Sequence, residues 1–372
     1  MVKTKSADVV VVGAGVIGCS VAYHLAKVGV SVLVLERGRV GREASWASAG
    51  ILTHARPAST HPYERLATLS RGLFESLIKE LIELSGVDPE YRLSGGVHVF
   101  LEDEGVERAR NYYRGSVLTG LEVEFLEPAD LFELEPALNR EARAAIRFPG
   151  DGSIRPPRLV RALSLAAQRL GTRILEHSPV VEMKVRSGRV TDILTPEERI
   201  QGGSFVLATG AWSGLVGDRV GVNLPVYSSK GEIVLLESLP GKLGQIVNNN
   251  GHYLVPRSDG KLLVGATEDA VGFDKTSTVH GVLELLEWAY HVAPGLSDAT
   301  FVTSWAGLRP AVRRGGPYLG RLKDFENLYV ATAHNSNGML LSPASGLLMS
   351  QLLTNRPTSL SLEPFAVPET GS

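Results

Sequence analysis

The feature that most constrains this chain is a glycine-rich turn at residues 13–18, GAGVIG, which fits the pattern G-x-G-x-x-G. It follows a short β-branched run at residues 8–12 and opens a helical pattern that ends before Gly29. A second apolar run, typical of a buried strand, covers residues 31–36. The first 36 residues therefore predict a parallel strand–helix–strand unit with its turn at the glycines.

Each part of this unit has a physical role in holding a dinucleotide. Gly13 allows the tight turn, Gly15 lets the backbone approach a pyrophosphate, and Gly18 lets the helix pack closely on the strand. The phosphates would lie at the positive end of the helix. Glu36, 18 residues after Gly18, can accept hydrogen bonds from a ribose diol.

Composition excludes several classes of protein. The chain has 372 residues, which suggests two or three structural units. Lys plus Arg number 38 and Asp plus Glu 40, a balance that predicts neither a nucleic-acid nor a membrane-surface partner. Cys19 is the only cysteine, so an internal disulfide and a cysteine-based metal cage are excluded, and no metal site is predicted.

The apolar run near the N-terminus has two interpretations. It could be the core of a secretory signal, but it is broken by glycines and no small-residue cleavage site follows. No stretch reaches the roughly 20 apolar residues that a membrane-spanning helix needs. We therefore expect a cytoplasmic protein.

Two more segments allow close backbone approach to a long cofactor. Residues 45–52, SWASAGIL, are small and hydroxyl-bearing, although a plain surface loop would have the same composition. Residues 208–210, ATG, follow a buried strand, but they would also serve as an ordinary strand-to-helix connection. The turn at residues 13–18 does not distinguish a flavin from a nicotinamide dinucleotide, whereas these two segments favour the longer flavin cofactor.

Periodicity predicts the remaining elements. Helices are expected at residues 63–85, 157–170, 278–292 and 342–353; strands at 173–176, 180–185, 205–208 and 328–331; short strands and acidic helices within 97–148; a loop at 41–52; an antiparallel sheet within 224–267; and a frayed tail over about the last ten residues.

Five further motifs carry a resemblance to a known family: EASWASAGIL, LATGAWS, HYLVPRSDGKLLVGAT, WAGLRP and HNSNGMLLSP. With GAGVIG, they make nearly the whole chain similar to the D-amino acid oxidase family of flavoproteins, and within it to the glycine oxidases of thiamine biosynthesis. The resemblance implies an α/β fold with an α+β substrate part. It implies a discontinuous Rossmann-type FAD-binding domain (1–85, 145–222 and 305–372) and a substrate-binding domain on a large antiparallel sheet (86–144 and 223–304).

The resemblance also implies which residues contact FAD. They are Gly13, Gly15, Val16, Ile17, Gly18, Glu36, Arg37, Ala44, Ser45, Ala49, Gly50, Ile51, Val180, Thr209, Gly210, His334, Asn335, Ser336, Asn337, Gly338, Met339 and Leu340. FAD is expected to be non-covalent, because the only cysteine is in the first helix and Ala47 and Ser48 stand where some relatives carry a linking histidine. The start of the last helix is expected against the flavin, although Ser342 and Pro343 could also be a simple helix cap.

Two residues are identified by the resemblance as substrate-binding. Arg309 in WAGLRP matches the arginine that grips the substrate carboxylate, a task suited to a bidentate guanidinium. Tyr253 in HYLVPR matches a tyrosine that adds a hydroxyl to the same carboxylate. Taken alone, these residues would fit a surface arginine and an aromatic side chain packed in a strand. Arg257 and Lys261 are expected to flank a turn.

The chain departs from the family pattern at two positions. Ser336 stands where some glycine oxidases carry a second arginine, so the pocket has one fewer cation. Glu268, in GATED, replaces an apolar residue of some relatives. It would meet an ammonium group if it faces the pocket, and otherwise it is an ordinary loop carboxylate.

The activity implied by the resemblance is oxidative deamination of glycine or another small amino acid, such as sarcosine or a D-amino acid. The products would be the imine or oxo acid and, from molecular oxygen, hydrogen peroxide, in a homo-oligomer (tetramer or dimer). Two alternatives stay open: a dehydrogenase for D-amino acids or D-proline that passes electrons to a quinone, and a non-catalytic FAD-binding subunit. Transfer of the imine to a thiazole-synthesis partner is also open.

Overall fold

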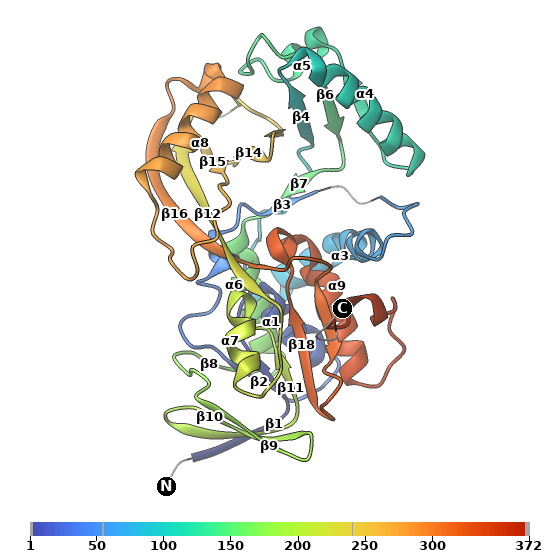
Figure 1. The fold of residues 1–372 in the computed structure, drawn as a ribbon, viewed down its shortest axis with the longest axis vertical. Helices are drawn as coiled ribbons and strands as arrows, with labels where there is room; N and C mark the ends of the chain where they lie inside the picture. Colours follow the sequence, from blue (N-terminus) through green and yellow to red (C-terminus); the bar gives the residue numbers. More distant parts are fainter. Residues whose placement is uncertain (1–2, 54–55, 240, 369–372) are drawn as a thin grey trace.

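The computed structural model describes residues 3–53, 56–239 and 241–368. The chain forms two large sheets, one in the lower and one in the upper half of the view in Figure 1. The chain crosses between the two sheets several times. Each sheet is therefore assembled from segments that lie far apart in the sequence.

The first sheet has the order β17-β18-β11-β1-β2-β8, and a hairpin of β9 and β10 extends from β11. Its strands are β1 (Lys3–Val12), β2 (Val32–Leu35), β8 (Arg173–Leu175), β9 (Glu182–Arg186), β10 (Arg189–Leu194), β11 (Glu198–Leu207), β17 (Tyr318–Arg321) and β18 (Leu328–Thr332). The pairs β1–β2, β1–β11, β2–β8 and β11–β18 are parallel. This parallel core confirms the strand–helix–strand unit predicted from the glycine-rich turn.

Helices pack on one face of the parallel strands. They are α1 (Val16–Lys27), α3 (Pro62–Ser85), α6 (Pro156–Arg169) and α9 (Gly338–Leu353), which contact one another. Val9 and Val11 of β1 face this helical core, whereas Val10 and Val12 face a second core on the other side of the sheet. Burial on both faces explains why β1 is a continuous apolar run.

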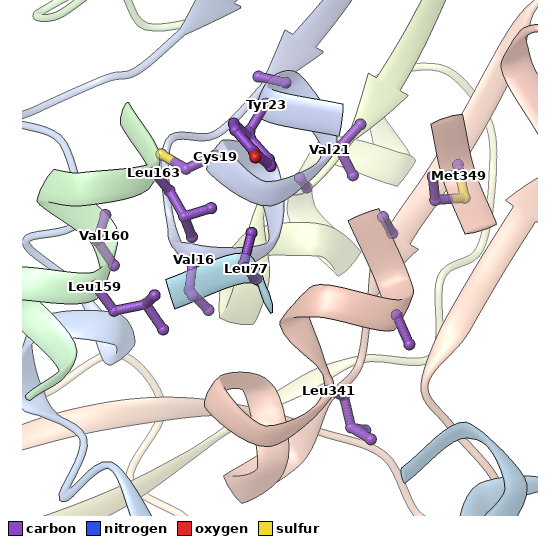
Figure 2. Packing of buried hydrophobic residues seen from close by; sticks show 14 of the residues in the cluster. Val16, Cys19, Val21, Tyr23, Leu77, Leu159, Val160, Leu163, Leu341 and Met349 are labelled. Atoms are coloured by element: carbon purple, nitrogen blue, oxygen red, sulfur yellow. The ribbon is translucent and has the colours of Figure 1, made fainter. Parts of the chain in front are cut away.

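Figure 2 shows the helical core, where Cys19 of α1 lies near Leu163 of α6 and Leu77 of α3 lies next to α1, while Met349 of α9 lies on the opposite side of α1, beyond Val21. The chain turns out of α1 where expected, because Gly29 adopts a left-handed conformation with φ of 84°.

The second sheet has the order β16-β12-β15-β14-β13-β4-β6-β5. Its strands are β4 (Gly96–Phe100), β5 (Glu124–Leu126), β6 (Ala144–Phe148), β12 (Tyr227–Glu237), β13 (Ile246–Asn249), β14 (His252–Pro256), β15 (Lys261–Gly265) and β16 (Thr300–Ala311). All pairs are antiparallel except β13–β4. Helix α8 (Val279–Val292) covers one end, while α4 (Asp103–Leu118) and α5 (Pro128–Leu134) cover the other (Figure 1).

The remaining elements are short. They are α2 (Ala44–Ala47), α7 (Ser213–Asp218), the paired strands β3 (Ile51–Leu52) and β7 (Gly152–Ser153), and the 3-10 turns η1 (Gly210–Trp212), η2 (Pro294–Leu296), η3 (Asn335–Asn337) and η4 (Glu363–Phe365). The loop expected at residues 41–52 thus contains one helical turn and a short strand.

Two expectations about the C-terminal part of the chain are wrong. The last helix begins at Gly338, four residues before Ser342. Pro343 is tolerated inside it because the hydroxyl of Ser342 donates to the carbonyl of Met339 at 3.0 Å, the carbonyl that a backbone N–H at position 343 would use. The tail is also ordered as far as Phe365, whose ring is buried in the helical core; residues 369–372 lie outside the described part.

The pairing of β6 and β16 shows where the boundary between the two domains should be drawn. All of β6 and β16 belongs to the second sheet, whereas the expected boundaries at residues 145 and 305 cut these two strands. We propose the same two domains, with both strands assigned to the substrate-binding domain.

The close packing of the glycine-rich turn gives a first testable prediction. A Cβ on Gly18 would lie 1.9 Å from the carbonyl oxygen of Gly13, so Gly18→Ala should destabilise the fold by about 1–3 kcal/mol. Gly115 is the matched control, since it lies in α4 with no neighbour near its Cβ position, and Gly115→Ala should stabilise by about 0.5–1 kcal/mol. Urea unfolding measures both, and a G18A variant as stable as the wild type would contradict the packing argument.

Candidate active site

A cavity of about 410 Å³ lies where the two sheets meet. It brings together most of the residues expected to contact the cofactor or the substrate. Those that line it are Gly15, Val16, Ile17, Ala44, Ser45, Ala49, Gly50, Ile51, Gly210, Tyr253, Arg309, His334, Asn335, Ser336, Asn337, Gly338 and Met339. The other expected residues do not line it: Gly13, Gly18, Glu36, Arg37, Val180, Thr209 and Leu340.

The glycine-rich turn forms one end of the cavity. Gly13 has φ of 105°, and a Cβ there would lie 2.4 Å from the carbonyl oxygen of Ala208. The turn therefore packs directly on the end of β11. The backbone N–H of Val16, at the start of α1, donates to the hydroxyl of Ser45 at 2.9 Å. This places the EASWASAGIL segment against the positive end of the helix.

The carboxylate of Glu36 is fixed at the end of β2. It accepts the backbone N–H groups of Ala14 and Gly38, both at 2.9 Å. A buried acceptor beside a helix N-terminus, with glycines at positions 13 and 15 of the turn, fits the adenosine and pyrophosphate parts of a dinucleotide. The residues at this end of the cavity therefore fit the adenosine half of FAD.

The expected residues outside the cavity have other contacts. The guanidinium of Arg37 lies 3.6 Å from the ring centre of Trp212 and pairs with Glu43 at 2.7 Å. The carbonyl of Val180 accepts from Arg219, Leu340 is buried in the helical core, and the hydroxyls of Thr209 and Ser213 are 3.0 Å apart. Direct contact of these residues with the cofactor stays a prediction.

Arg309 lies on β16 at the other end of the cavity. Its guanidinium donates to the carbonyl of Lys230 at 3.2 Å and to that of Thr267 at 3.1 Å. The group fits only because residue 231 is glycine, where a Cβ would lie 2.3 Å from Nη2. Two of the five N–H donors of the guanidinium are used in these bonds.

Tyr253, on β14, lines the same cavity. Its ring packs on Gly265, where a Cβ would lie 2.7 Å from the ring, so this glycine defines the space for the tyrosine. Burial raises the pKa of the Tyr253 hydroxyl to about 12, although the positive charge of Arg309 has the smaller, opposite effect of lowering it. The hydroxyl is therefore neutral at physiological pH and can donate a hydrogen bond.

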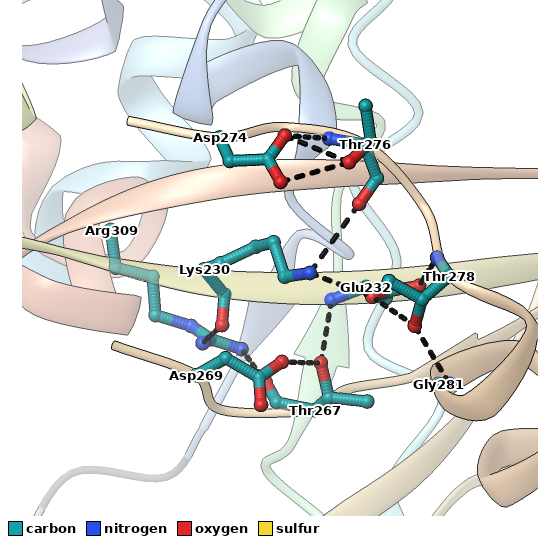
Figure 3. A network of polar contacts seen from close by, with 9 residues as sticks. All are labelled: Lys230, Glu232, Thr267, Asp269, Asp274, Thr276, Thr278, Gly281 and Arg309. Carbon is teal, nitrogen blue, oxygen red and sulfur yellow. Dashed lines mark hydrogen bonds and ion pairs between the residues drawn. The ribbon is translucent and has the colours of Figure 1, made fainter. Parts of the chain in front are cut away.

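A buried ion pair that the sequence analysis missed lies behind Arg309 (Figure 3). Nζ of Lys230 contacts Oε1 of Glu232 at 2.9 Å, and this bond raises the pKa of Lys230. Glu232 also accepts the backbone N–H of Thr278 at 2.8 Å. Main-chain bonds pair Lys230 with Asp269, so this network fixes both the carbonyl that holds Arg309 and the segment at 267–278.

Arg257 and Lys261 flank the β14–β15 turn as expected, since the backbone N–H of Arg257 donates to the carbonyl of Lys261 at 2.8 Å. Arg257 has a second set of contacts that the sequence did not indicate. Its guanidinium is buried and donates to the carbonyl of Ile154 at 2.9 Å and to that of Ala49. Burial lowers its pKa to about 10. Arg257 thus joins the β14–β15 hairpin to the cavity segment that leads into β3 and to the residue that follows β7. Lys261 pairs with Glu237 at 2.8 Å at the start of β15.

His334 is the only histidine among the described residues that line the cavity. Its Nε2 lies 2.9 Å from the hydroxyl of Ser345, and burial lowers its pKa to about 3. The neighbours Ala333 and Asn335 have positive φ angles of 61° and 47°. His334 is therefore a neutral group in a strained segment, where such conformations often accompany function.

The two departures from the family pattern both line the cavity. Ser336 lies in η3, just before α9. Glu268 lies at the edge of the cavity, largely exposed, and Oε1 accepts the hydroxyl of Ser229 at 3.2 Å. Of its two interpretations, the structure favours the one in which Glu268 faces the pocket.

No cluster of three or more His, Cys, Asp or Glu side chains has an arrangement that could hold a metal ion in the described part of the chain. Within the same ranges, no helix has both the length and the apolar character required to cross a membrane.

Comparison with known proteins shows the family. Residues 8–352 match the model of the FAD dependent oxidoreductase family. The chain is 37% identical to a glycine oxidase of Geobacillus kaustophilus over 98% of its length and 97% of that protein. It is 36% identical to a glycine oxidase of Pseudomonas aeruginosa, over 97% and 98%. It is also 30% identical to a bifunctional protein, ThiO/ThiG, of Synechocystis, over 97% of this chain and 54% of that protein.

Solved structures agree. The crystal structure of the glycine oxidase from Geobacillus kaustophilus superimposes with a TM-score of 0.93 at 34% identity, covering 98% of this chain and 99% of that one. An L-proline dehydrogenase from P. horikoshii shares the fold, with a TM-score of 0.87 at 23% identity over 97% and 98%.

The chain belongs to the FAD-dependent oxidoreductase family that includes D-amino acid oxidase. It is an FAD-dependent amine oxidoreductase, and the predicted fold class and cofactor are confirmed.

The buried position of Arg257 gives a second prediction. Arg257→Met leaves the carbonyls of Ala49 and Ile154 without their donor, at about 1–3 kcal/mol, and should loosen the segment at 49–51. We expect the dissociation constant of FAD to rise about tenfold or more. Titration of the apoprotein with FAD measures this change. Lys261→Met, on the same hairpin, is the control, and equal FAD affinity in the two variants would refute the role of Arg257.

Proposed function

We propose that this protein oxidises glycine or another small amino acid, such as sarcosine or a D-amino acid, with FAD and molecular oxygen. For glycine, the balanced reaction consumes oxygen and water and yields glyoxylate, ammonia and hydrogen peroxide. The observation that carries the proposal is that Arg309 and Tyr253 line the same cavity as the dinucleotide turn and the start of α9.

The cofactor would be held mainly by the residues that line the cavity from Gly15 to Ile51 and from His334 to Met339, with Glu36 at the adenosine end. FAD, when bound, supplies the two-electron acceptor for the hydride that leaves the substrate Cα. The start of α9 presents backbone N–H groups and the positive end of the helix dipole to this part of the cavity.

The substrate carboxylate would be bound by the free donors of Arg309 and by the hydroxyl of Tyr253. The carbonyls of Lys230 and Thr267 already hold the guanidinium in one orientation, so little is lost in ordering it when the substrate binds. Binding through two parallel hydrogen bonds fixes the direction of the Cα–H bond, and rate enhancement by positioning requires such fixing.

No protein base is needed for the bond that breaks, because the amine lone pair assists departure of the hydride. His334 is neutral and buried against Ser345, which is consistent with a positioning role for it. Hydrolysis of the imine by water then gives the oxo acid and ammonia. The relatives named glycine oxidase and ThiO/ThiG support a further proposal, that the imine or oxo acid serves thiamine thiazole synthesis.

The acceptor is tested by anaerobic mixing of the FAD-bound protein with glycine, sarcosine, D-alanine, D-proline and their L-counterparts. We expect glycine or sarcosine to bleach the flavin absorbance, and air to restore it rapidly with formation of hydrogen peroxide. Slow recovery in air, with rapid recovery upon addition of a quinone, would replace the oxidase proposal by a dehydrogenase. A protein with bound FAD that no amine bleaches would overturn the proposed function.

The carboxylate site gives a third prediction. Arg309→Ala should lower kcat/KM by about 30-fold to 1,000-fold, equivalent to about 2–4 kcal/mol of transition-state binding. Arg314→Ala, which removes an exposed arginine close in sequence, should leave kcat/KM unchanged. Steady-state kinetics with the best substrate of the panel measures both, and unchanged kcat and KM in R309A would reject the assignment.

A further inference from the structure

The carboxylate of Glu268 is fixed on the same wall of the cavity as the guanidinium of Arg309. Ser229 lies directly opposite Arg309 in the register of β12 and β16, and its buried hydroxyl donates to Oε1 of Glu268 at 3.2 Å. The residue before Glu268 is Thr267, whose carbonyl accepts from Nη2 of Arg309 at 3.1 Å. The side chains of Glu268 and Arg309 are therefore held close together, the first by the hydroxyl of Ser229 and the second by the carbonyl of Thr267.

These two side chains dominate the charge of the cavity. Of the described residues that line it, only Arg309 and Glu268 carry a formal charge at neutral pH, since burial keeps Tyr253 and His334 neutral. Nearby Lys230 directs its ammonium to Glu232 and to the carbonyl of Thr276. The cavity thus presents one cation and one anion, and Ser336 adds no second cation.

This pattern is complementary to a zwitterion. An α-amino acid carries a carboxylate and an ammonium on the same carbon, so a ligand gripped by Arg309 brings its nitrogen close to the wall that holds Glu268. A hydroxy acid or a simple carboxylic acid has no cation to offer, and it leaves the Glu268 carboxylate facing a like charge.

We propose that Glu268 is the specificity-determining residue that recognises the substrate amine and selects α-amino acids over hydroxy and simple carboxylic acids. This inference rests on the proposed function, because it assigns the amine end of the ligand whose carboxylate Arg309 binds. The segment at 267–278, fixed by the Lys230–Glu232 pair, supplies the rigid support that such selection requires.

The role has a consequence for pH dependence with a definite sign. A carboxylate beside the substrate ammonium stabilises the charged form and raises the pKa of that amine in the complex. Glu268 should therefore tighten binding of the amino acid at neutral pH. Because removal of the hydride requires the neutral amine, Glu268 should also shift the pH at which kcat increases to a higher value. The charged or titratable groups that line the cavity with Glu268 are Arg309, Tyr253 and His334, and the supporting strand and segment carry Lys230, Glu232 and Asp269. All of them are retained in the variant tested.

The test compares Glu268→Gln with the wild type, both loaded with FAD. Glutamine keeps the size of the side chain and an acceptor for Ser229 but removes the charge. In E268Q we expect KM for glycine at pH 7 to rise about tenfold, while the inhibition constant of glycolate stays constant or falls. In the pH profile of kcat, the increase should occur about one unit lower in E268Q than in the wild type. Glycine and glycolate differ only in the amine and hydroxyl, so opposite responses isolate recognition of the amine.

Glu287→Gln is the matched control, since Glu287 is an exposed carboxylate on α8 outside the cavity, and all three quantities should stay constant in it. The inference is overturned if E268Q weakens glycine and glycolate equally, or if it changes neither of them while the wild type remains active. A wild type with bound FAD that no amine bleaches is a different outcome, which rejects the proposed function itself. Equal FAD affinity in E268Q and wild type would show that the effect is not a loss of structure.

Discussion

The structure depends on close approach of backbone to backbone at the end of the first sheet that borders the cavity. The turn at Gly13 packs on the carbonyl of Ala208, and Gly18 packs on the carbonyl of Gly13, so β1, α1 and β11 converge through backbone contacts. A long cofactor needs such a surface, because a side chain at Gly15 would occupy the space of the phosphates. The start of α9 completes the same surface from a distant part of the chain.

The same principle applies at the substrate end of the cavity. Arg309 lies over Gly231 and Tyr253 lies over Gly265, each on a neighbouring strand, so two large polar side chains fit flat against an antiparallel sheet. The carbonyls of Lys230 and Thr267 hold the guanidinium, and the buried Lys230–Glu232 pair fixes the segment at 267–278 through its bonds to Thr276 and Thr278. A buried pair of this kind costs desolvation free energy, and its benefit here is the fixed orientation of Arg309.

Sequence reasoning succeeded where the physical signal is local. The GAGVIG turn between two apolar runs predicted β1, α1 and β2, and the motifs WAGLRP and HYLVPR directed attention to Arg309 and Tyr253, which do lie in one cavity. It failed where the signal is tertiary. Nothing near Arg257 in the sequence indicates that its guanidinium reaches the carbonyls of Ala49 and Ile154.

The buried ion pair shows the same limit. Lys230 and Glu232 are two residues apart on β12, which places them on one face, but a charged pair at this spacing is typical of an exposed strand. Only the packing of the segment at 267–278 over that face buries them. The orientation of Glu268 was open for the same reason, because it depends on the hydroxyl of Ser229 on another strand.

The central claim is that one cavity holds the cofactor at one end and a substrate carboxylate at Arg309 and Tyr253 at the other. A crystal structure of the protein with FAD and glycolate tests this most directly. We expect the carboxylate of glycolate to lie within hydrogen-bond distance, about 2.7–3.2 Å, of the Arg309 guanidinium and the Tyr253 hydroxyl. A ligand bound elsewhere in the cavity, with Arg309 contacting only the carbonyls of Lys230 and Thr267, would contradict it.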